Sequence, residues 1–240
     1  MDKQQLEAEI VGGLGLDSPV IGLTFVDEAP VGVTVSESPA PSACSMWRQA
    51  ETDVFYAPAE RHFNCAVGAM TMGFELPGEV QQRLGQVVEM MCSCGYLASD
   101  EPASIPTIKQ QSAGIVYGPL GKLPVEPDLA VMWLDPRQAM LFAEAAGGAN
   151  WANGQTMAFT GRPACAALPL ALEGGPRLSL GCAGMRTFTD VSQDRMLAVV
   201  PGANLAEFTA ALNSTVHANQ SMQGAYDQMK AEFTGAPAAP

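Results

Sequence analysis

Apolar residues recur every three or four positions in two segments of the first hundred residues, which is the spacing of one helix face. The first segment predicts a short amphipathic helix that ends near Gly12–Gly13. Its apolar positions are Leu6, Ile10 and Leu14. The second segment, residues 78–91, predicts a longer helix with a clear apolar face. That face carries Val80, Leu84, Val87, Val88 and Met91.

The last part of the chain predicts two further helices. One begins at Asn204, where Glu207 three residues later completes the pattern of a capping box. The other covers residues 222–233. Its apolar face carries Met222, Tyr226, Met229 and Phe233.

A continuous apolar run, Leu129–Leu134, is typical of a buried strand. The residues after it carry the signals of a helix start, because Asp135 is a good N-cap and proline suits the first helical position, here Pro136. Gly147–Gly148 are expected to stop this helix. A strand followed at once by a helix is the unit from which α/β and α+β folds are built.

Shorter strand-like runs alternate with glycine and proline turns along the rest of the chain. They lie at residues 19–30, 105–124, 155–190 and 196–202. No internal repeat and no linker interrupts the middle of the sequence. We therefore expect one mixed α/β (α+β) domain over residues 1–235, with a mixed sheet flanked by helices, and a disordered tail at residues 236–240.

The composition is apolar for a chain of this size. Hydrophobic residues make up 48% of the 240 residues, and charged residues make up 15%, against a usual value of about 25%. A chain of this length buries a core without needing disulfides or a metal. The polar surface must then rely on Gln, Ser, Thr and Asn, or a partner covers part of the apolar surface, which would fit a homo-oligomer.

The charge of the chain argues against nucleic acid and anionic membranes. Its 25 acidic and 12 basic residues give a net charge of −13, and the basic residues form no cluster. The N-terminus lacks the apolar core of a signal peptide, and no run approaches the ~20 apolar residues of a spanning helix. We therefore expect a cytoplasmic protein without membrane insertion. Its six cysteines are then expected to be reduced thiols, metal ligands or redox groups.

Two of the cysteines form a C-x-C pair, Cys92 and Cys94, and the sequence contains no C-x-x-C pair. If the preceding helix continues through them, their side chains point about 160° apart and do not chelate one ion. Cys94 would then join the apolar face as a small core residue. If the helix ends near Met91, the pair becomes a plausible chelate.

The other four cysteines each lie in a loop or beside a glycine, where sulfur can be presented to a ligand. They are Cys44, Cys65, Cys165 and Cys182. Four such thiols brought together by folding would suit an iron–sulfur cluster or zinc. Taken one at a time, each cysteine equally fits a buried core position, since free cysteines are among the most buried residue types.

The segment "RLSLGCAGMRTFTD", residues 177–190, is the most distinctive of these settings. Gly181 and Gly184 flank Cys182 and leave room for a bulky group close to the backbone. Arg186 follows four residues after the thiol, where it could balance the charge of a cluster or hold a substrate carboxylate. Arg162 stands three residues before Cys165 in a similar relation. Either arginine also fits a surface charge with a packed stem.

The chain has two histidines, which excludes a site made of several histidines. His62 lies three residues before Cys65, a spacing that allows the two side chains to share a ligand on one helical turn. His217 is expected on a solvent-facing helix surface. The sequence contains none of the motifs H-E-x-x-H, G-x-S-x-G or Walker A.

Several segments together resemble the domain-of-unknown-function 169 family of archaeal and bacterial proteins. They are "CSMWRQA", "FNCAVGAMTMGF", "PDLAVMWLDPRQAM", "ACAALPLAL" and "LSLGCAGMRTFTDVSQDRMLAVVPG". The resemblance spans residues 19–202, and the G-C-x-G-x-R element is its most specific part. It implies one mixed α/β domain and an anaerobic or redox setting. It also implies that Cys44, Cys65, Cys165 and Cys182 belong to the sequence pattern shared by the family, whereas Cys92 and Cys94 are peculiar to this chain.

The leading hypothesis is that Cys44, Cys65, Cys165 and Cys182 ligate one iron–sulfur cluster of the four-iron kind, for electron transfer to a redox partner protein or for sensing. Gly181, Gly184, Arg186 and His62 would surround it. One alternative is a thiol enzyme with Cys182 or Cys65 as nucleophile, activated by Arg186 or His62. Others are a zinc site, a haem site with a cysteine or His62 as axial ligand, and an interaction module whose cysteines are buried.

Overall fold

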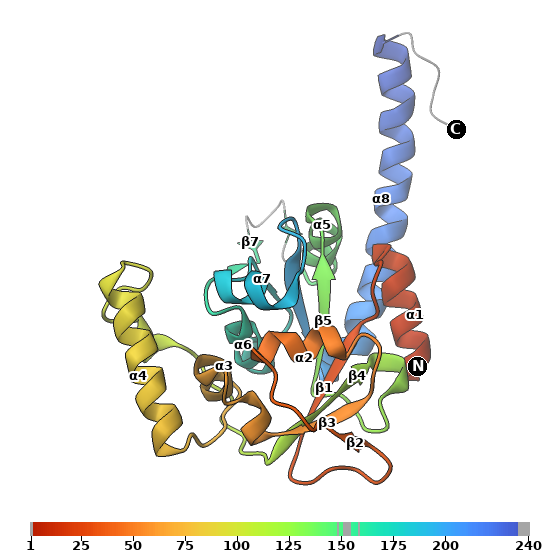
Figure 1. The fold of residues 1–240 in the computed structure, drawn as a ribbon. Helices are drawn as coiled ribbons and strands as arrows, with labels where there is room; N and C mark the ends of the chain where they lie inside the picture. The colour runs from red at the N-terminus through yellow and green to blue at the C-terminus, as the bar shows by residue number, and fades with distance from the viewer. Residues whose placement is uncertain (1, 148, 151–154, 158, 235–240) are drawn as a thin grey trace.

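The computed structural model describes residues 2–147, 149–150, 155–157 and 159–234. Among these residues, one mixed sheet of eight strands lies between two layers of helices (Figure 1). Its strands are β1 (Ile21–Val26), β2 (Thr34–Val35), β3 (Phe55–Pro58), β4 (Gly114–Pro119), β5 (Leu129–Leu134), β8 (Phe159–Thr160), β9 (Arg177–Ser179) and β10 (Met196–Pro201). The predicted mixed α/β fold is confirmed. The predicted tail at residues 236–240 lies outside the described residues.

The strands follow one another across the sheet in the order β2-β3-β4-β1-β5-β10-β9-β8. The outermost pairs at the two edges, β2 with β3 and β8 with β9, are parallel. The pairs between them are antiparallel, including β1 with β5 and β5 with β10. A second, two-stranded sheet joins β6 (Ala149–Asn150) to β7 (Gln155–Thr156).

The central strand β5 is buried on both faces, as its apolar run predicts. Side chains alternate between the faces of a strand. Leu129, Val131 and Trp133 therefore pack into one core cluster, while the intervening side chains pack into a second one. The neighbouring strand β10 divides its residues between the same two cores. The sheet thus separates two hydrophobic cores.

Each core is covered by its own layer of helices. On one face lie α2 (Ala43–Gln49), α3 (Ala66–Thr71), α6 (Ala167–Gly174) and α7 (Ala183–Thr189). On the other lie α1 (Lys3–Leu14), α5 (Pro136–Ala145) and α8 (Leu205–Thr234). The helix α4 (Gly78–Ser93) stands to one side of the first layer (Figure 1). None of the described helices is long and apolar enough to cross a membrane.

The start of α5 forms as its local signals predict. The Asp135 side chain accepts a hydrogen bond from the Gln138 backbone N–H at 2.8 Å, and the Gln138 side chain accepts one from the Asp135 N–H at 2.8 Å. Pro136 is the first helical residue. Gly147 follows the helix with a φ of 73°, and Gly148 lies outside the described residues.

The predicted helix is present as α1, and it ends one residue beyond Gly12–Gly13. The helix continues to Leu14, and Gly15 terminates it in the left-handed conformation with a φ of 68°. Gly13 instead lies within the helix where α8 crosses it. A methyl group at Gly13 would approach the Leu212 Cδ2 atom to 3.3 Å, so the missing side chain permits this close packing.

The two predicted C-terminal helices are one continuous helix, α8, of 30 residues. Asn204 is the last residue of a 3-10 turn, Gly202–Asn204, and α8 begins directly after it at Leu205. The predicted helix over residues 78–91 is confirmed as α4, which extends to Ser93. The prediction that Cys94 joins the core is wrong, since Cys94 caps α4 and is exposed.

Candidate functional site

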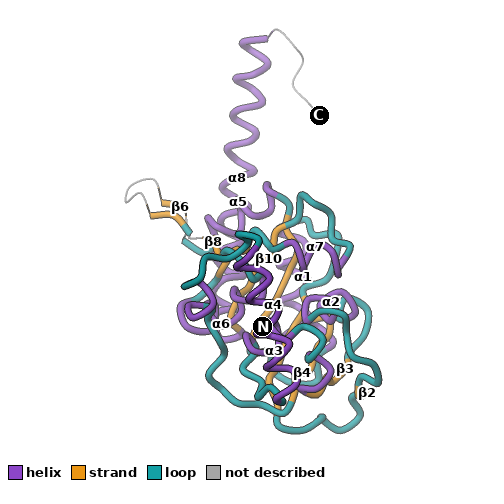
Figure 2. The backbone as a smooth tube through the Cα atoms, turned by 60° about the vertical axis from the view of Figure 1, so that its left-hand side comes forward, coloured by secondary structure: helices purple, strands orange, loops and turns teal. Residues whose placement is uncertain are grey.

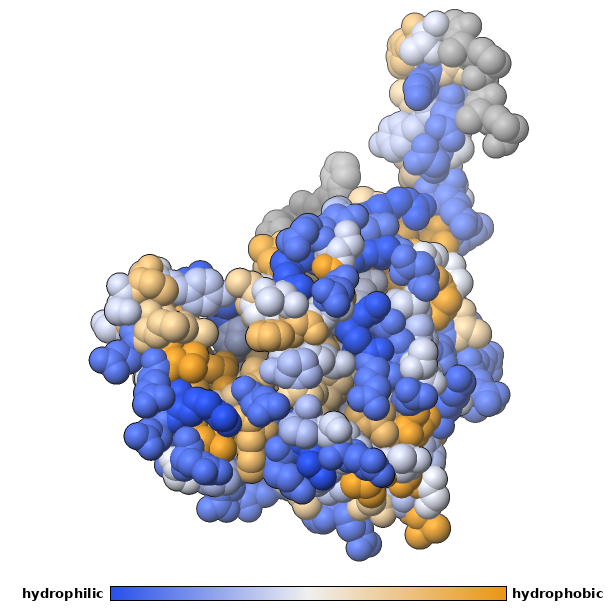
Figure 3. Space-filling view, in the orientation of Figure 1, coloured by the Kyte–Doolittle hydropathy of each residue, from blue (hydrophilic) through white to orange (hydrophobic). Residues whose placement is uncertain are grey.

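One pocket brings together the four cysteines that lie in loop or glycine settings in the sequence. Its volume is about 260 Å³, and it opens between α4 and the first helix layer. Its lining includes Cys44, Cys65, Cys165 and Cys182. In Figure 3, apolar surface is visible in the hollow between α4, on the left, and the body of the molecule. We call this space the cysteine pocket.

Each of the four cysteines stands at or next to the start of a helical element. Cys44 is the second residue of α2, which Ser42 caps. Cys65 and Cys182 occupy the N-cap positions of α3 and α7. Cys165 lies in the 3-10 turn Ala164–Ala166 that leads into α6. Backbone N–H groups at such positions lack partners within the helix, so they are available to sulfur.

The backbone around Cys182 shows such a hydrogen bond. The Met185 N–H donates to the Cys182 Sγ atom at 3.4 Å. Gly181 precedes the thiol with a φ of 82°, a conformation that side chains rarely adopt. Gly184 lines the pocket, and a methyl group there would meet none of the described atoms within 4 Å. The predicted room beside this cysteine is therefore present on the Gly184 side.

Gly68 is a further residue of the site that the sequence analysis does not identify. It lines the pocket on α3. A methyl group built there would lie 2.7 Å from the Ala43 Cβ atom and 3.0 Å from the Cys65 Sγ atom. The absence of a side chain thus lets α3 pack against α2 and brings Cys65 toward the helix that carries Cys44. The only sequence signal is a glycine three residues after a cysteine.

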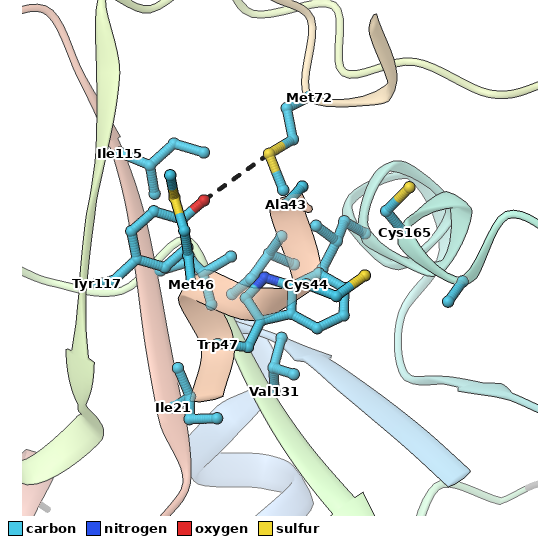
Figure 4. Close-up of a cluster of buried hydrophobic side chains, with 14 of the residues drawn as sticks. Ile21, Ala43, Cys44, Met46, Trp47, Met72, Ile115, Tyr117, Val131 and Cys165 are labelled. Carbon is cyan, nitrogen blue, oxygen red and sulfur yellow. Dashed lines mark hydrogen bonds between the residues drawn. The ribbon is translucent and has the colours of Figure 1, made fainter. Parts of the chain in front are cut away.

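Two of the thiols are buried and two are partly exposed. Cys44 and Cys165 are buried, and Figure 4 shows their side chains close together, one on α2 and the other beside α6. Cys65 and Cys182 are partly exposed. The pocket therefore has an apolar floor with two sulfurs and a more open part with two.

Burial makes the two inner thiols weak acids. It raises the pKa of Cys165 to about 12, and negative charge on the Cys65 and Cys182 sulfurs would raise it as well. Burial also raises the pKa of Cys44 well above its usual value, and the other three thiolates would add to this. Cys44 thus lies within electrostatic reach of the other three sulfurs. Without a cation in the pocket, Cys44 and Cys165 are neutral thiols at pH 7.

The outer wall of the pocket is the apolar face of α4. Within α4, Val80 is buried against the first core and Leu84 packs against it. The later members of the face, Val87, Val88 and Met91, line the cysteine pocket instead. The apolar face of α4 therefore packs on the core with its first residues and lines the cysteine pocket with its later ones.

Two arginines line the pocket, Arg162 and Arg83, and the sequence analysis identified Arg162 as a possible charge partner. The Arg162 guanidinium lies over the Tyr96 ring, 4.3 Å from its centroid, and its Nη2 atom is 4.0 Å from a Glu101 carboxylate oxygen. Arg83, on α4, also lines the pocket and donates to the Phe63 carbonyl. The sequence gives no signal for Arg83, because this residue lies far along the chain from each of the four cysteines.

Arg186 has a different place from the one expected. Its guanidinium donates to the carbonyl oxygens of Leu180 at 2.8 Å, Arg195 at 3.1 Å and Ser192 at 3.3 Å. It is not among the described residues that line the pocket. These three hydrogen bonds hold the segments on either side of α7 together, so Arg186 positions the loop that carries Cys182.

His62 is a buried core residue. Its Nε2 atom lies 2.9 Å from the Tyr117 hydroxyl, and its Nδ1 atom lies 3.2 Å from the Pro58 carbonyl oxygen. Burial lowers the pKa of His62 to about 4, so the ring is neutral at pH 7. With both nitrogens hydrogen-bonded, the ring has no nitrogen left for a metal ion or for activation of Cys65. His62 is also absent from the described residues that line the pocket.

The C-x-C pair lies apart from the cysteine pocket at the end of α4. The Cys92 Sγ atom faces the Ala98 carbonyl at 3.9 Å, and the Cys94 Sγ atom faces the Met91 carbonyl at 3.4 Å. Neither residue is among the described lining residues of the pocket. In the part of the chain that the structure describes, no group of three or more histidine, cysteine or acidic side chains is arranged to hold a single metal ion.

The sequence of the chain was compared with protein-family models, curated proteins and solved structures. The model of the DUF169 family, described as an uncharacterised ArCR, matches residues 9–211. This range contains the whole cysteine pocket. No curated protein and no solved structure matches the chain.

Proposed function

The chain belongs to the uncharacterised DUF169 family, and from its cysteine pocket we propose that it binds one iron–sulfur cluster, of the four-iron kind, for electron transfer or redox sensing. The four cysteines of the pocket would each supply one thiolate. The observation that carries the proposal is that these cysteines come from four separate segments and line one pocket.

The chemistry of the pocket suits such a group. Thiolates are soft, anionic donors that favour iron–sulfur clusters, zinc and copper(I). The raised pKa values of Cys44 and Cys165 mean that, without a bound metal, both are neutral thiols, and metal binding would release their protons. The backbone N–H that donates to Cys182 is of the kind that adjusts the potential of a cluster through its sulfur ligands.

A single zinc ion and a four-iron cluster require different spacings of the four sulfurs. Four sulfurs bound to one zinc at about 2.3 Å must approach each other to within roughly 4 Å. In a four-iron cluster each thiolate binds its own iron, so the sulfurs stand farther apart. The described cysteines line a common pocket, and the choice of a cluster as their ligand rests on that observation.

The alternative of a thiol enzyme finds less support. The groups expected to activate a nucleophile are used elsewhere, since His62 bonds Tyr117 and Arg186 bonds backbone carbonyls. Haem also fits less well. The pocket volume of about 260 Å³ is below the roughly 300–1,000 Å³ typical of sites for organic ligands of ordinary size.

The two partly exposed cysteines indicate where electrons would enter and leave. A cluster held by Cys65 and Cys182 on its outer side would lie near the surface, where a redox partner protein could approach. Thiols kept free for metal binding also fit a reducing compartment, so we propose that the protein acts in the cytoplasm.

Anaerobic purification followed by iron and sulfide analysis tests the proposal. We expect about four irons and four sulfides per chain and a broad absorbance band near 400 nm, as the four-iron type requires. Cys165→Ser should remove most of this iron, whereas Cys94→Ser, which changes an exposed cysteine outside the pocket, should leave it unchanged. A wild-type protein that stays free of iron after reconstitution with iron and sulfide would contradict the proposal.

A further inference from the structure

The second half of α8 extends beyond the body of the molecule. Figures 1 and 2 both show the helix leaving the sheet and its neighbours α1 and α5. Four large apolar side chains on this half are exposed, with Met222 at 51%, Tyr226 at 57%, Met229 at 47% and Phe233 at 82% of their full surface. A half-helix of this length is marginal in water unless something packs against it.

These side chains continue the same helix face that the first half of α8 buries. In the first half, Leu205, Phe208 and Leu212 lie in the second core. Asn219 marks the point where this face leaves the body, and its side chain donates to a Glu144 carboxylate oxygen at 2.7 Å. The positions alternate at spacings of three and four residues, which is the a/d pattern of a coiled coil. They are 205, 208, 212, 215, 219, 222, 226, 229 and 233.

We propose that this exposed stripe, residues 222–233 of α8, pairs with the same stripe of a second copy of the chain, with the two helices antiparallel. In this register Met222 faces Phe233 of the second copy, and Tyr226 faces its Met229. Every layer then joins a methionine to an aromatic ring, a contact that thioether sulfur favours. A parallel pair would instead stack each residue on itself.

The dimensions and charges of the helix fit this partner. The four layers span roughly 17 Å of helix, and antiparallel pairing places the two bodies at opposite ends. Residues 218–234 carry two acidic groups and one lysine, whereas the whole chain has a net charge of −13. Two copies can therefore pair here with little like-charge repulsion. One lysine is also too little positive charge for an anionic membrane surface.

The residues beside the stripe distinguish the two orientations. In the antiparallel register Gln223 lies next to Lys230 of the second copy, and Ala225 lies next to its Glu232. In a parallel pair Gln223 would face Ala218 instead. A charge placed at residue 223 therefore responds to Lys230 only in the antiparallel dimer.

Sedimentation velocity tests the pairing. We expect the apparent mass to rise from 25.1 kDa toward twice that value as the protein concentration increases. The double variant Tyr226→Glu/Met229→Glu should stay at the monomer mass. Gln220→Glu/Gln228→Glu makes the same charge change on the opposite face and should dimerise like the wild type. A wild type that is monomeric throughout, or a double variant that still dimerises, would overturn the proposal.

Charge variants at residue 223 test the orientation. Gln223→Glu should tighten the dimer and Gln223→Lys should weaken it, each roughly 2- to 10-fold for two symmetric pairs. Gln223 also donates to an Asp227 carboxylate oxygen on its own helix at 2.9 Å, a pair that favours lysine and disfavours glutamate at residue 223 and so acts against the expected effect of Lys230. The controls are Gln220→Glu and Gln220→Lys. If the two charges at residue 223 act no differently from those at residue 220, the antiparallel arrangement is wrong. This inference is independent of the cluster, because the stripe lies on a different part of the molecule.

Discussion

The His62 Nε2 atom lies 2.9 Å from the Tyr117 hydroxyl in the floor of the first core. The Tyr117 O–H donates to Nε2 in the neutral tautomer that carries its proton on Nδ1 and donates to Pro58. Phe74 packs beside the ring at a centroid distance of 4.8 Å. The pair thus holds the turn that precedes Cys65, and it does so with an uncharged imidazole.

This pair makes stability depend on pH. Burial lowers the pKa of His62 from 6.5 to about 4, so between these values the unfolded chain binds the proton and the folded chain does not. The stabilisation is complete above pH 6.5 and is lost as the pH falls toward 4, by roughly 3 kcal/mol at most. Urea unfolding at pH 7, 5.5 and 4.5 measures it.

The variant His62→Gln keeps a polar side chain and removes the titrating group. We expect its free energy of unfolding to fall less between pH 7 and 4.5 than that of the wild type. His217→Gln is the matched control, because it makes the same exchange at an exposed histidine on α8. An unchanged slope in His62→Gln would show that other groups cause the acid sensitivity.

The metal-free protein should show a definite order of cysteine reactivity. Cys94 is exposed, whereas Cys44 and Cys165 are buried thiols with raised pKa values. Since the thiolate is the reactive form, iodoacetamide at pH 7.5 should modify Cys94 first and these two last. Peptide mass spectrometry over a time course gives the order. Rapid modification of Cys165 would contradict the buried, neutral thiol.

Substitution of Gly68 should disturb the pocket without touching a cysteine. Gly68→Ala places a methyl group 2.7 Å from the Ala43 Cβ atom and 3.0 Å from the Cys65 Sγ atom, so α2 and α3 must move apart. We expect a loss of about 1–3 kcal/mol in stability and a lower iron content. Thermal unfolding and iron analysis measure the two effects.

Gly85→Ala is the matched control for this change. It also adds a methyl group to a helical glycine, but none of the described atoms lies within 4 Å of it. Alanine favours the helix over glycine by up to about 1 kcal/mol, so this variant should be as stable as the wild type or more so. Equal effects at residues 68 and 85 would show that helix propensity alone decides the result.

The cap of α5 should contribute a measurable share of stability. Asp135→Ala removes the acceptor for the Gln138 N–H and should cost about 1 kcal/mol in the free energy of unfolding. Glu89→Ala, an exposed position within α4, is expected to change it by less than about 0.5 kcal/mol. Chemical denaturation of both variants provides the comparison. A loss no larger than that of Glu89→Ala would mean that water replaces the cap.

The sequence by itself predicted the features that depend on neighbours along the chain. The apolar run Leu129–Leu134 and the cap at Asp135 form the expected strand and helix start, because their signals act through backbone bonds only a few residues apart. The apolar period of residues 78–91 predicted α4 in the same way. The mixed α/β fold followed from these units, and the four cysteines followed from their loop and glycine settings together with the resemblance to the family.

Only the tertiary structure determined which long-range contacts these side chains make. Arg186 and His62 stand near cysteines in the sequence, yet backbone carbonyls and Tyr117 take their hydrogen bonds. Arg83 and Gly68 reach the pocket only because α4 packs beside α3 and α3 packs beside α2. The apolar face of α8 keeps one period along the whole helix. Its first half is buried and its second half is exposed because the helix extends beyond the body of the molecule. Periodicity determines which side chains share a face, whereas long-range packing determines what covers that face.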